Sequence, residues 1–338
     1  MTIKHLSTVT RGLILTLALS GCLSGCTTLL TNLQNYNIDL QAAAKTANLP
    51  LQVELKDVPF FPQETNQCGP AALATLLNHV GQAVSPEQLV GQVYLPQRAG
   101  SLQTELMAAT RRAGLVAYEL LPNSDEWLKE VAAGHPVLIL ENLRFSFYPQ
   151  WHYAVIVGYD LQANEVILRS GSIRQLVVPM TQFMAQWRGG RSWGFVALKA
   201  DQLPASAMST NNTSNQAAAR YLQAVTALER VAPDAALTAY QTALHPWPDE
   251  LAALIGLGNL YYQKKQWVAA EQQYRRATQV HPTSGDAFNN LAQVLLDQQQ
   301  WQTALQAAQM AVSLGGVRID IYQATLKQVT QQMALHHQ

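Results

Sequence analysis

The sequence predicts an α+β domain followed by an all-helical repeat array. In the first half of the chain, helical patterns come first and runs rich in Val, Ile and aromatic residues follow, which is the order typical of an α+β domain. In the second half, a helical pattern recurs with a period of 34 residues. The length of 338 residues is consistent with two domains.

The composition argues against a nucleic-acid partner. Charged residues make up 13% of the chain, about half of the ~25% found in an average soluble domain. Lys and Arg number 22, as do Asp and Glu, so the formal net charge is +0. Binding to a phosphate backbone needs a concentrated basic face, and this composition does not supply an excess of basic residues.

Residues 1–21 have the pattern of an export signal. Lys4 and Arg11 flank the start of the apolar run GLILTLALSG, which is too short to span a bilayer. The tetrapeptide LSGC then occurs twice. A small-residue pair followed by Cys resembles a bacterial lipobox, in which the thiol is acylated and becomes the mature N-terminus. An ordinary cleaved signal or an uncleaved anchor remains the alternative, and either would also export the chain.

The lipobox resemblance implies a lipid-anchored protein of the bacterial cell envelope. Cys22 directly follows the apolar core and is the expected lipidation site, with Cys26 as the alternative. Residues 22–50 would then form a lipidated tether. Neither Leu23 nor Thr27 is Asp, which by analogy with enteric sorting indicates the outer membrane, facing the periplasm.

Residues 51–200 begin with four expected helices. The first spans about Gly69 to Val80, with Pro70 in its first turn and Gly81 as a stop signal. The second starts at Ser85-Pro86, where Gln88 can complete a capping box. The third and fourth are the segments LQTELMAATRRAG and DEWLKEVAAG, and each ends at a glycine.

After the fourth helix, the pattern of apolar residues changes from that of helices to that of strands. The expected strands are PVLILEN, HYAVIVGYDL, EVILRSG, RQLVVP and SWGFVALK. The second and third are joined by DLQANE, which is short enough for a hairpin. Consecutive strands of this kind predict an antiparallel sheet packed with the preceding helices.

A Ser/Thr/Asn-rich linker is expected at 201–216, followed by the repeats at 217–336. Residues 34 apart match in four pairs: Leu257 with Leu291, Trp267 with Trp301, Ala270 with Ala304 and Ala277 with Ala311. This period resembles tetratricopeptide repeats. It divides the region into units at 217–250, 251–284 and 285–318 and an end helix at 319–336, and it implies a protein or peptide partner.

The middle repeat unit matches the tetratricopeptide motif best, with Leu257, Gly258, Tyr261, Ala270, Tyr274, Ala277 and Pro282 in order. The last unit departs from the motif, because Ala308 replaces the aromatic residue and Gly316 stands where the proline belongs. The first unit is a degenerate copy. Three units are about the minimum for a stable stack.

Cys68 opens the first helix, and three roles are open to its thiol: a nucleophile, half of a disulfide, or a small core residue. The other two cysteines belong to the lipobox repeat, and Cys26 could pair with Cys68 only if residues 27–50 folded back. The positive end of a helix dipole lowers a thiol pKa. The position therefore favours a nucleophile.

The segments VPFFPQE, QCGPAALATLL and WHYAVIVGYD resemble the bacteriocin-processing (double-glycine) peptidases, which are papain-like cysteine peptidases. The resemblance implies a papain-like fold with Cys68 as nucleophile and His152 as general base. It also implies that Gln63 supplies the side-chain amide of the oxyanion hole, with Gln67 as a second candidate. No cofactor is expected.

The chain departs from that family at the third triad position, where Ser170 stands in place of the usual Asp. A serine hydroxyl can hydrogen-bond an imidazole but cannot stabilise imidazolium by charge. Catalysis could then rest on a Cys/His dyad, use a carboxylate from outside the motif, or be lost. Asp160 and Glu165 are the nearest carboxylates, and both are expected in solvated turns.

No metal site is expected, since no carboxylate or thiol stands at ligand spacing from His336 and His337. His79 is expected to cap the first helix, His135 precedes a strand, and His281 lies in a repeat turn. His336 and His337 form the end of the chain.

The sequence thus predicts an exported, lipid-anchored cysteine peptidase that cleaves peptide bonds, with repeats that bind a partner or substrate. The alternative is a catalytically weakened peptidase fold acting as a peptide-binding or envelope scaffold. A third hypothesis is cell-wall hydrolysis by a related Cys/His fold, although those families usually carry a DCSG-type turn. Double-glycine leader specificity is not carried over, since the sequence has no transporter segment.

Overall fold

The computed structural model describes residues 40–63, 66–208 and 214–336. The signal at 1–21, Cys22, Cys26 and most of the tether at 22–50 lie outside these residues. No helix within the described ranges is both long and apolar enough to cross a membrane.

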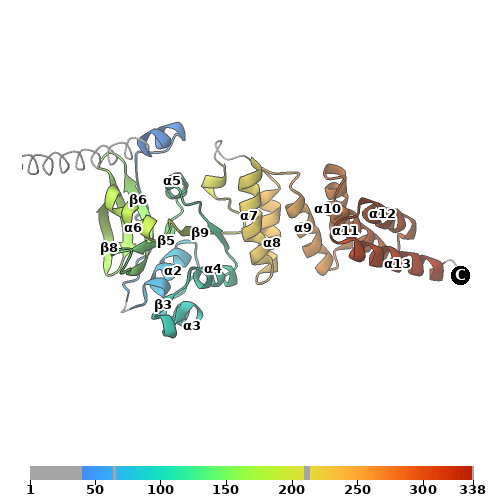
Figure 1. The fold of residues 1–338 in the computed structure, drawn as a ribbon, viewed down its shortest axis with the longest axis horizontal. Coiled ribbons are helices and arrows are strands. Elements are labelled where there is room, and N and C mark those ends of the chain that lie inside the picture. Colours follow the sequence, from blue (N-terminus) through green and yellow to red (C-terminus); the bar gives the residue numbers. More distant parts are fainter. Residues whose placement is uncertain (1–39, 64–65, 209–213, 337–338) are drawn as a thin grey trace, which may run out of the picture.

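The N-terminal part is an antiparallel sheet with helices on both faces (Figure 1). The order of the main sheet is β4-β9-β5-β6-β7-β8, and β1 pairs with the end of β6. The strands are β1 (Gln52–Glu54), β4 (Val116–Glu119), β5 (Val137–Asn142), β6 (Trp151–Asp160), β7 (Glu165–Ser170), β8 (Ile173–Pro179) and β9 (Gly194–Leu198). Two short strands, β2 (Tyr94–Leu95) and β3 (Gly100–Ser101), form a separate hairpin.

The labelled helices of this region are α2 (Cys68–His79), α3 (Pro86–Val93), α4 (Gln103–Arg112), α5 (Ser124–Ala132) and α6 (Met180–Gly189). The first four confirm the expected helices, and Ser85 and Gln88 form the expected capping box. Helix α6, between β8 and β9, is an addition to the expected elements. The order of helices and antiparallel strands confirms the predicted α+β fold.

The two faces of the central strands contact different helices. Leu138, Val155 and Val157 share a core with residues of α2 and α4. Ile139 and Ile156 alternate with them and pack with Trp127 of α5 and Phe183 of α6. Both faces of β5 and β6 are therefore buried, which explains their nearly continuous apolar sequences.

The C-terminal region is helical throughout its described part, in agreement with the predicted repeat array. Its helices are α7 (Ser214–Glu229), α8 (Pro233–Ala243), α9 (Leu251–Gln263), α10 (Trp267–Val280), α11 (Gly285–Asp297), α12 (Trp301–Leu314) and α13 (Ile319–His336). They extend in a row away from the sheet (Figure 1). Gly258 allows the close packing of α9 and α10, since a Cβ there would stand 2.4 Å from the ring of Tyr274.

Part of the segment expected as a linker packs against the sheet domain. The buried carboxylate of Glu130 on α5 accepts hydrogen bonds from the backbone N–H groups of Ala205 and Ser206. Arg220 on α7 forms an ion pair with Glu126 and donates to the hydroxyl of Tyr118. These contacts attach the first repeat helix to α5 and β4.

Candidate active site

Cys68 is the first residue of α2 and carries a free, half-buried thiol. The helix can begin so close to β3 because residue 69 is glycine. A Cβ on Gly69 would stand 2.3 Å from Oγ of Ser101. This close approach brings the sulfur against β6.

Burial, rather than the helix N-terminus, sets the charge state of the thiol. The backbone N–H groups of Tyr153, Gly69 and Cys68 itself lower its pKa, but desolvation by burial is larger and raises the pKa above the ordinary value of 9.0. The expected net lowering is therefore wrong. In the resting protein the thiol is protonated at neutral pH, and an attack on a carbonyl needs a group that takes the proton.

His152 is positioned by the first residues of β6. It is 8% exposed, and its Nε2 is hydrogen-bonded to Oγ of Ser170 at 2.8 Å. Ser170 ends β7, which runs antiparallel to β6, so the sheet itself brings the two side chains together. Burial lowers the pKa of His152, and a neutral imidazole is the form that can accept a proton.

Gln63 is held by backbone contacts of the segment that precedes α2. Its N–H donates to the carbonyl of Gly171 at 3.1 Å. Earlier in the segment, the buried guanidinium of Arg169 donates to the carbonyl of Val58. The segment is thus fixed to the end of β7, and Gln63 lies beside the start of α2.

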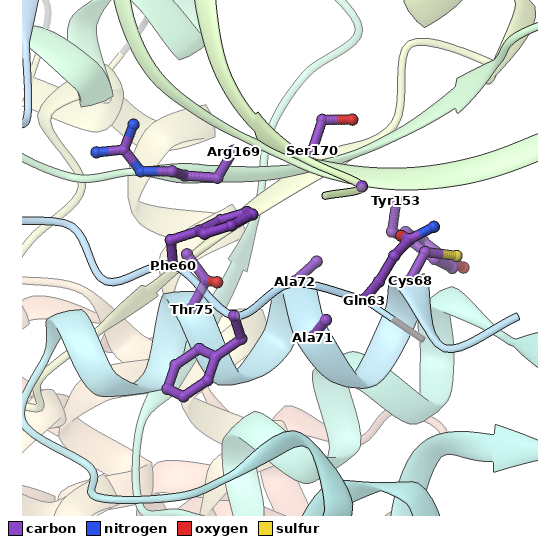
Figure 2. A pocket seen from close by; sticks show the side chains of 11 residues that line it. Phe60, Gln63, Cys68, Ala71, Ala72, Thr75, Tyr153, Arg169 and Ser170 are labelled. Atoms are coloured by element: carbon purple, nitrogen blue, oxygen red, sulfur yellow. The ribbon is translucent and has the colours of Figure 1, made fainter. Parts of the chain in front are cut away.

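A narrow crevice is lined by Gln63, Cys68 and Ser170 among the expected site residues (Figure 2). Helix α2 forms its floor in this view, Cys68 lies near one end, and the strand that carries Ser170 passes above. The lining residues are Phe60, Phe61, Gln63, Cys68, Ala71, Ala72, Thr75, Tyr153, Arg169, Ser170 and Gly171. Gln67, the second oxyanion candidate, does not belong to this lining.

His152 does not line this crevice, but its ring is hydrogen-bonded to Ser170, which does. The next residue, Tyr153, packs with residues of α2. Among the described residues, no hydrogen bond joins the ring of His152 to Sγ of Cys68. The sulfur nevertheless faces the backbone N–H of Tyr153, which is the next residue along β6, so the two groups meet at the same end of this strand.

A larger groove of about 650 Å³ adjoins the crevice and shares Cys68 and Tyr153 with it. Its walls include Trp151 at the start of β6 and the guanidinium-bearing residues Arg98 and Arg191. None of the described residues that line it is a carboxylate. An extended chain lying in this groove would pass the thiol and meet a positively charged wall.

The sequence interpretation missed Glu141, which lies opposite His152 in the β5–β6 register. Glu141 is 1% exposed, and its Oε1 has no hydrogen-bond partner. Burial raises the pKa of this carboxyl to about 7. The signal in the sequence that could have identified it was a single acidic residue within the largely apolar strand PVLILEN.

The two carboxylates considered from the sequence lie elsewhere. Asp160 and Glu165 pair with each other at the opposite end of β6 and β7 from His152 and Ser170. Oδ1 of Asp160 accepts the backbone N–H groups of Gln162 and Ala163, which stabilises the turn between the strands. Neither carboxylate belongs to the candidate site.

Four other histidines within the described ranges have side-chain contacts away from the candidate site. His79 bonds the carbonyl of Gly134 instead of capping its own helix. His135 pairs with Glu130, His281 bonds the carbonyl of Asp249, and His336 stacks on Trp301. Within the described residues, no group of three or more His, Cys, Asp or Glu side chains could hold a metal ion.

Two family models match separate parts of the chain. Residues 55–192 match the Peptidase_C39-like family, and residues 258–299 match a TPR repeat. No curated protein matches the chain.

Several solved structures resemble one part of the chain each. A C39-like peptidase from Bacillus anthracis shares 22% identity over 44% of this chain and 98% of its own, with a TM-score of 0.36. The peptidase domain of Streptococcus ComA, a bifunctional ABC transporter, shares 19% sequence identity over 42% of this chain and 98% of its own, with a TM-score of 0.35. The TPR domain of Aspergillus fumigatus Sgt2 shares 19% sequence identity over 37% of this chain and 83% of its own, with a TM-score of 0.33. The two family matches describe a Peptidase_C39-like domain followed by a TPR-repeat region.

Proposed function

We propose that this protein is an exported, lipid-anchored cysteine peptidase that cleaves a peptide or protein substrate in the bacterial cell envelope. The observation that carries the proposal is the crevice lined by Gln63, Cys68 and Ser170, with His152 hydrogen-bonded to Ser170. The Peptidase_C39-like match over residues 55–192 supports the reaction class. The repeated LSGC motif supports the anchor, with Cys22 or Cys26 as the acylated residue.

The proposed reaction begins with the protonated thiol of Cys68. His152 takes the proton from Sγ as the sulfur attacks the carbonyl carbon of the scissile peptide bond. The side-chain amide of Gln63 and the backbone N–H of Cys68 donate to the resulting oxyanion. The C–N bond then breaks, the amine leaves with the proton from His152, and a thioester remains. Water activated by His152 hydrolyses the thioester and restores the thiol.

The hydrogen bond between His152 and Ser170 determines which ring nitrogen accepts the thiol proton. Nε2 is bonded to Oγ of Ser170, so Nδ1 is the nitrogen available to the thiol proton. In this arrangement Nε2 carries the hydrogen and donates it to Ser170. The hydroxyl of Ser170 thus fixes the tautomer of the ring without contributing a charge.

The TPR repeats indicate a protein-binding region, and they would hold a partner or substrate beside the peptidase domain. Helix α7 is attached to α5 and β4 by the Arg220 contacts. A ligand bound on the repeats would therefore keep a defined position relative to the groove. The absence of Asp after either candidate lipidation site supports an outer-membrane location facing the periplasm.

The experiment uses the purified chain and a peptide-based electrophile that reacts with cysteine peptidases. Wild type should be labelled at one site, Cys68→Ala should not be labelled, and His152→Ala should react at least 100-fold more slowly. Cleavage of a peptide library should be lost in the same two variants. Labelling of Cys68 at the rate of an ordinary thiol, together with no cleavage, would refute the enzymatic role.

The alternative is a weakened peptidase fold that binds peptide without cutting it. In that case the repeats would recruit an envelope partner. Two observations favour it: Ser170 supplies no charge, and burial raises the pKa of the Cys68 thiol. Measuring turnover in wild type and in Ser170→Asp separates the two functions. Turnover in either form supports the enzyme, and binding of peptide without turnover in both forms supports the scaffold.

A further inference from the structure

Glu141 is a buried carboxyl group in the largely apolar strand β5. It stands at a strand position between Leu140 and Asn142, 1% exposed, with Oε1 lacking a partner. Burying a carboxylate without hydrogen bonds is costly. Neighbouring positions on the same strand carry Ile and Leu, and an apolar residue would satisfy the same packing. An unpaired acidic residue at this depth calls for an explanation other than stability.

The sheet register places Glu141 beside His152. The two residues are directly opposed Cα partners in the antiparallel β5–β6 pair. Directly opposed residues project from the same face, with Cβ atoms about 4.5–5.5 Å apart. His152 in turn bonds Ser170 on the next strand, β7. Glu141, His152 and Ser170 thus lie on three adjacent strands, with His152 next to Glu141 by register and next to Ser170 by its hydrogen bond.

We propose that Glu141 is the positioning residue of His152 and supplies the negative charge that Ser170 cannot provide. This inference rests on the proposed peptidase function. The usual third residue of such a site both orients the imidazole and stabilises imidazolium. Here the two tasks are divided, because the hydroxyl of Ser170 orients the ring through Nε2 while the carboxylate of Glu141 acts through space.

The proton balance follows from the proposed reaction. When His152 takes the proton of Cys68, the ring gains a positive charge inside a buried site, where unpaired charge is costly. A carboxylate one strand away favours the charged ring, and the ring equally favours the ionised form of Glu141. In the resting protein the neutral ring gives no such support, which agrees with the raised pKa of Glu141.

The test compares Glu141→Gln with Glu165→Gln as a matched control. Glu165 is the acidic residue at the far end of β7 and contacts neither His152 nor Ser170. With the cysteine-directed electrophile and a cleaved peptide, Glu141→Gln should lower kcat and the labelling rate of Cys68 about 100-fold. KM should change less than twofold, and the control variant should match wild type in both parameters.

A rescue experiment distinguishes a charge role from a structural role. Ser170→Asp returns a carboxylate to the ring from the opposite side. In the Glu141→Gln background it should restore labelling to within about tenfold of wild type. A structural defect caused by Gln at 141 would not respond to a carboxylate at 170.

The outcomes separate this inference from the proposed function. Wild-type kcat and labelling in Glu141→Gln would overturn the role of Glu141, even if His152→Ala abolishes both. Loss of activity in Glu141→Gln without rescue by Ser170→Asp would also overturn it. Labelling of Cys68 that ignores His152→Ala would refute the peptidase function itself, and the role of Glu141 with it.

Discussion

The buried carboxyl of Glu141 leads to a quantitative prediction about stability. Its pKa is about 7 in the folded protein, against an ordinary value of 4.5. A difference of one pKa unit corresponds to about 1.4 kcal/mol, so the ionised carboxylate costs the folded state about 3 kcal/mol. Replacement by Gln keeps the shape of the protonated side chain and removes this cost.

The sign of the pH dependence follows from proton linkage. Between pH 4.5 and 7 the folded state binds more protons at Glu141 than the unfolded state, so the free energy of unfolding falls as pH rises. Below pH 4.5 both states are protonated there, and Glu141→Gln should have wild-type stability. At pH 8 the variant should be more stable by about 3 kcal/mol. The lowered pKa of His152 acts in the opposite direction, but both proteins contain this residue.

Urea unfolding at pH values from 4 to 8, followed by tryptophan fluorescence, measures this difference. A stability difference that does not vary with pH would refute the assignment of Glu141 as a buried, unpaired acid. A variant less stable than wild type at pH 8 would mean that the carboxylate has a stabilising partner in the resting protein. A variant that is both more stable and less active would show that Glu141 is retained for function at the expense of stability.

Two further predictions concern the groove and the repeats. Replacing Arg98 and Arg191 together by Glu should lower kcat/KM about tenfold for peptides that carry an acidic side chain next to the scissile bond, because the charges of the groove wall are reversed; an equal loss for acidic and basic peptides would contradict this charge preference. Gly258→Ala should destabilise the repeat region by about 1–3 kcal/mol in urea unfolding, since its Cβ would collide with the buried ring of Tyr274. Gly91→Ala on α3, where the Cβ meets no atom within 4 Å, is the matched control and should be neutral or slightly stabilising; equal effects of the two changes would show that Gly258 is not needed for close packing.

The local signals of the sequence predicted the helices of the first domain closely. Helix α2 runs from Cys68 to His79, one residue from the expected limits, because Pro70 and Gly81 are strong start and stop signals. The capping box at Ser85 is also a local interaction and formed as expected. Helix α6 was not anticipated, because it begins directly after Pro179, the last residue of β8, with no loop between them.

The properties that depend on tertiary packing could not be read from local patterns. The helix N-terminus predicts a lowered pKa for Cys68, but the sign is reversed by burial against β6. Likewise, the pairing of Glu141 with His152 depends on the register of β5 and β6, which is set by the hairpin between them. The sequence distance between these residues does not reveal that they share a face.

The dependence of Cys68 reactivity on His152 tests the central claim most directly. The second-order rate constant for labelling by a cysteine-directed peptide electrophile is measured at pH 7 in wild type and in His152→Ala. A thiol activated by the imidazole predicts a fast reaction in wild type and a loss of at least 100-fold in the variant. Equal rate constants, both in the range of an ordinary protonated thiol, would contradict the assignment of Cys68 and His152 as a nucleophile and its base.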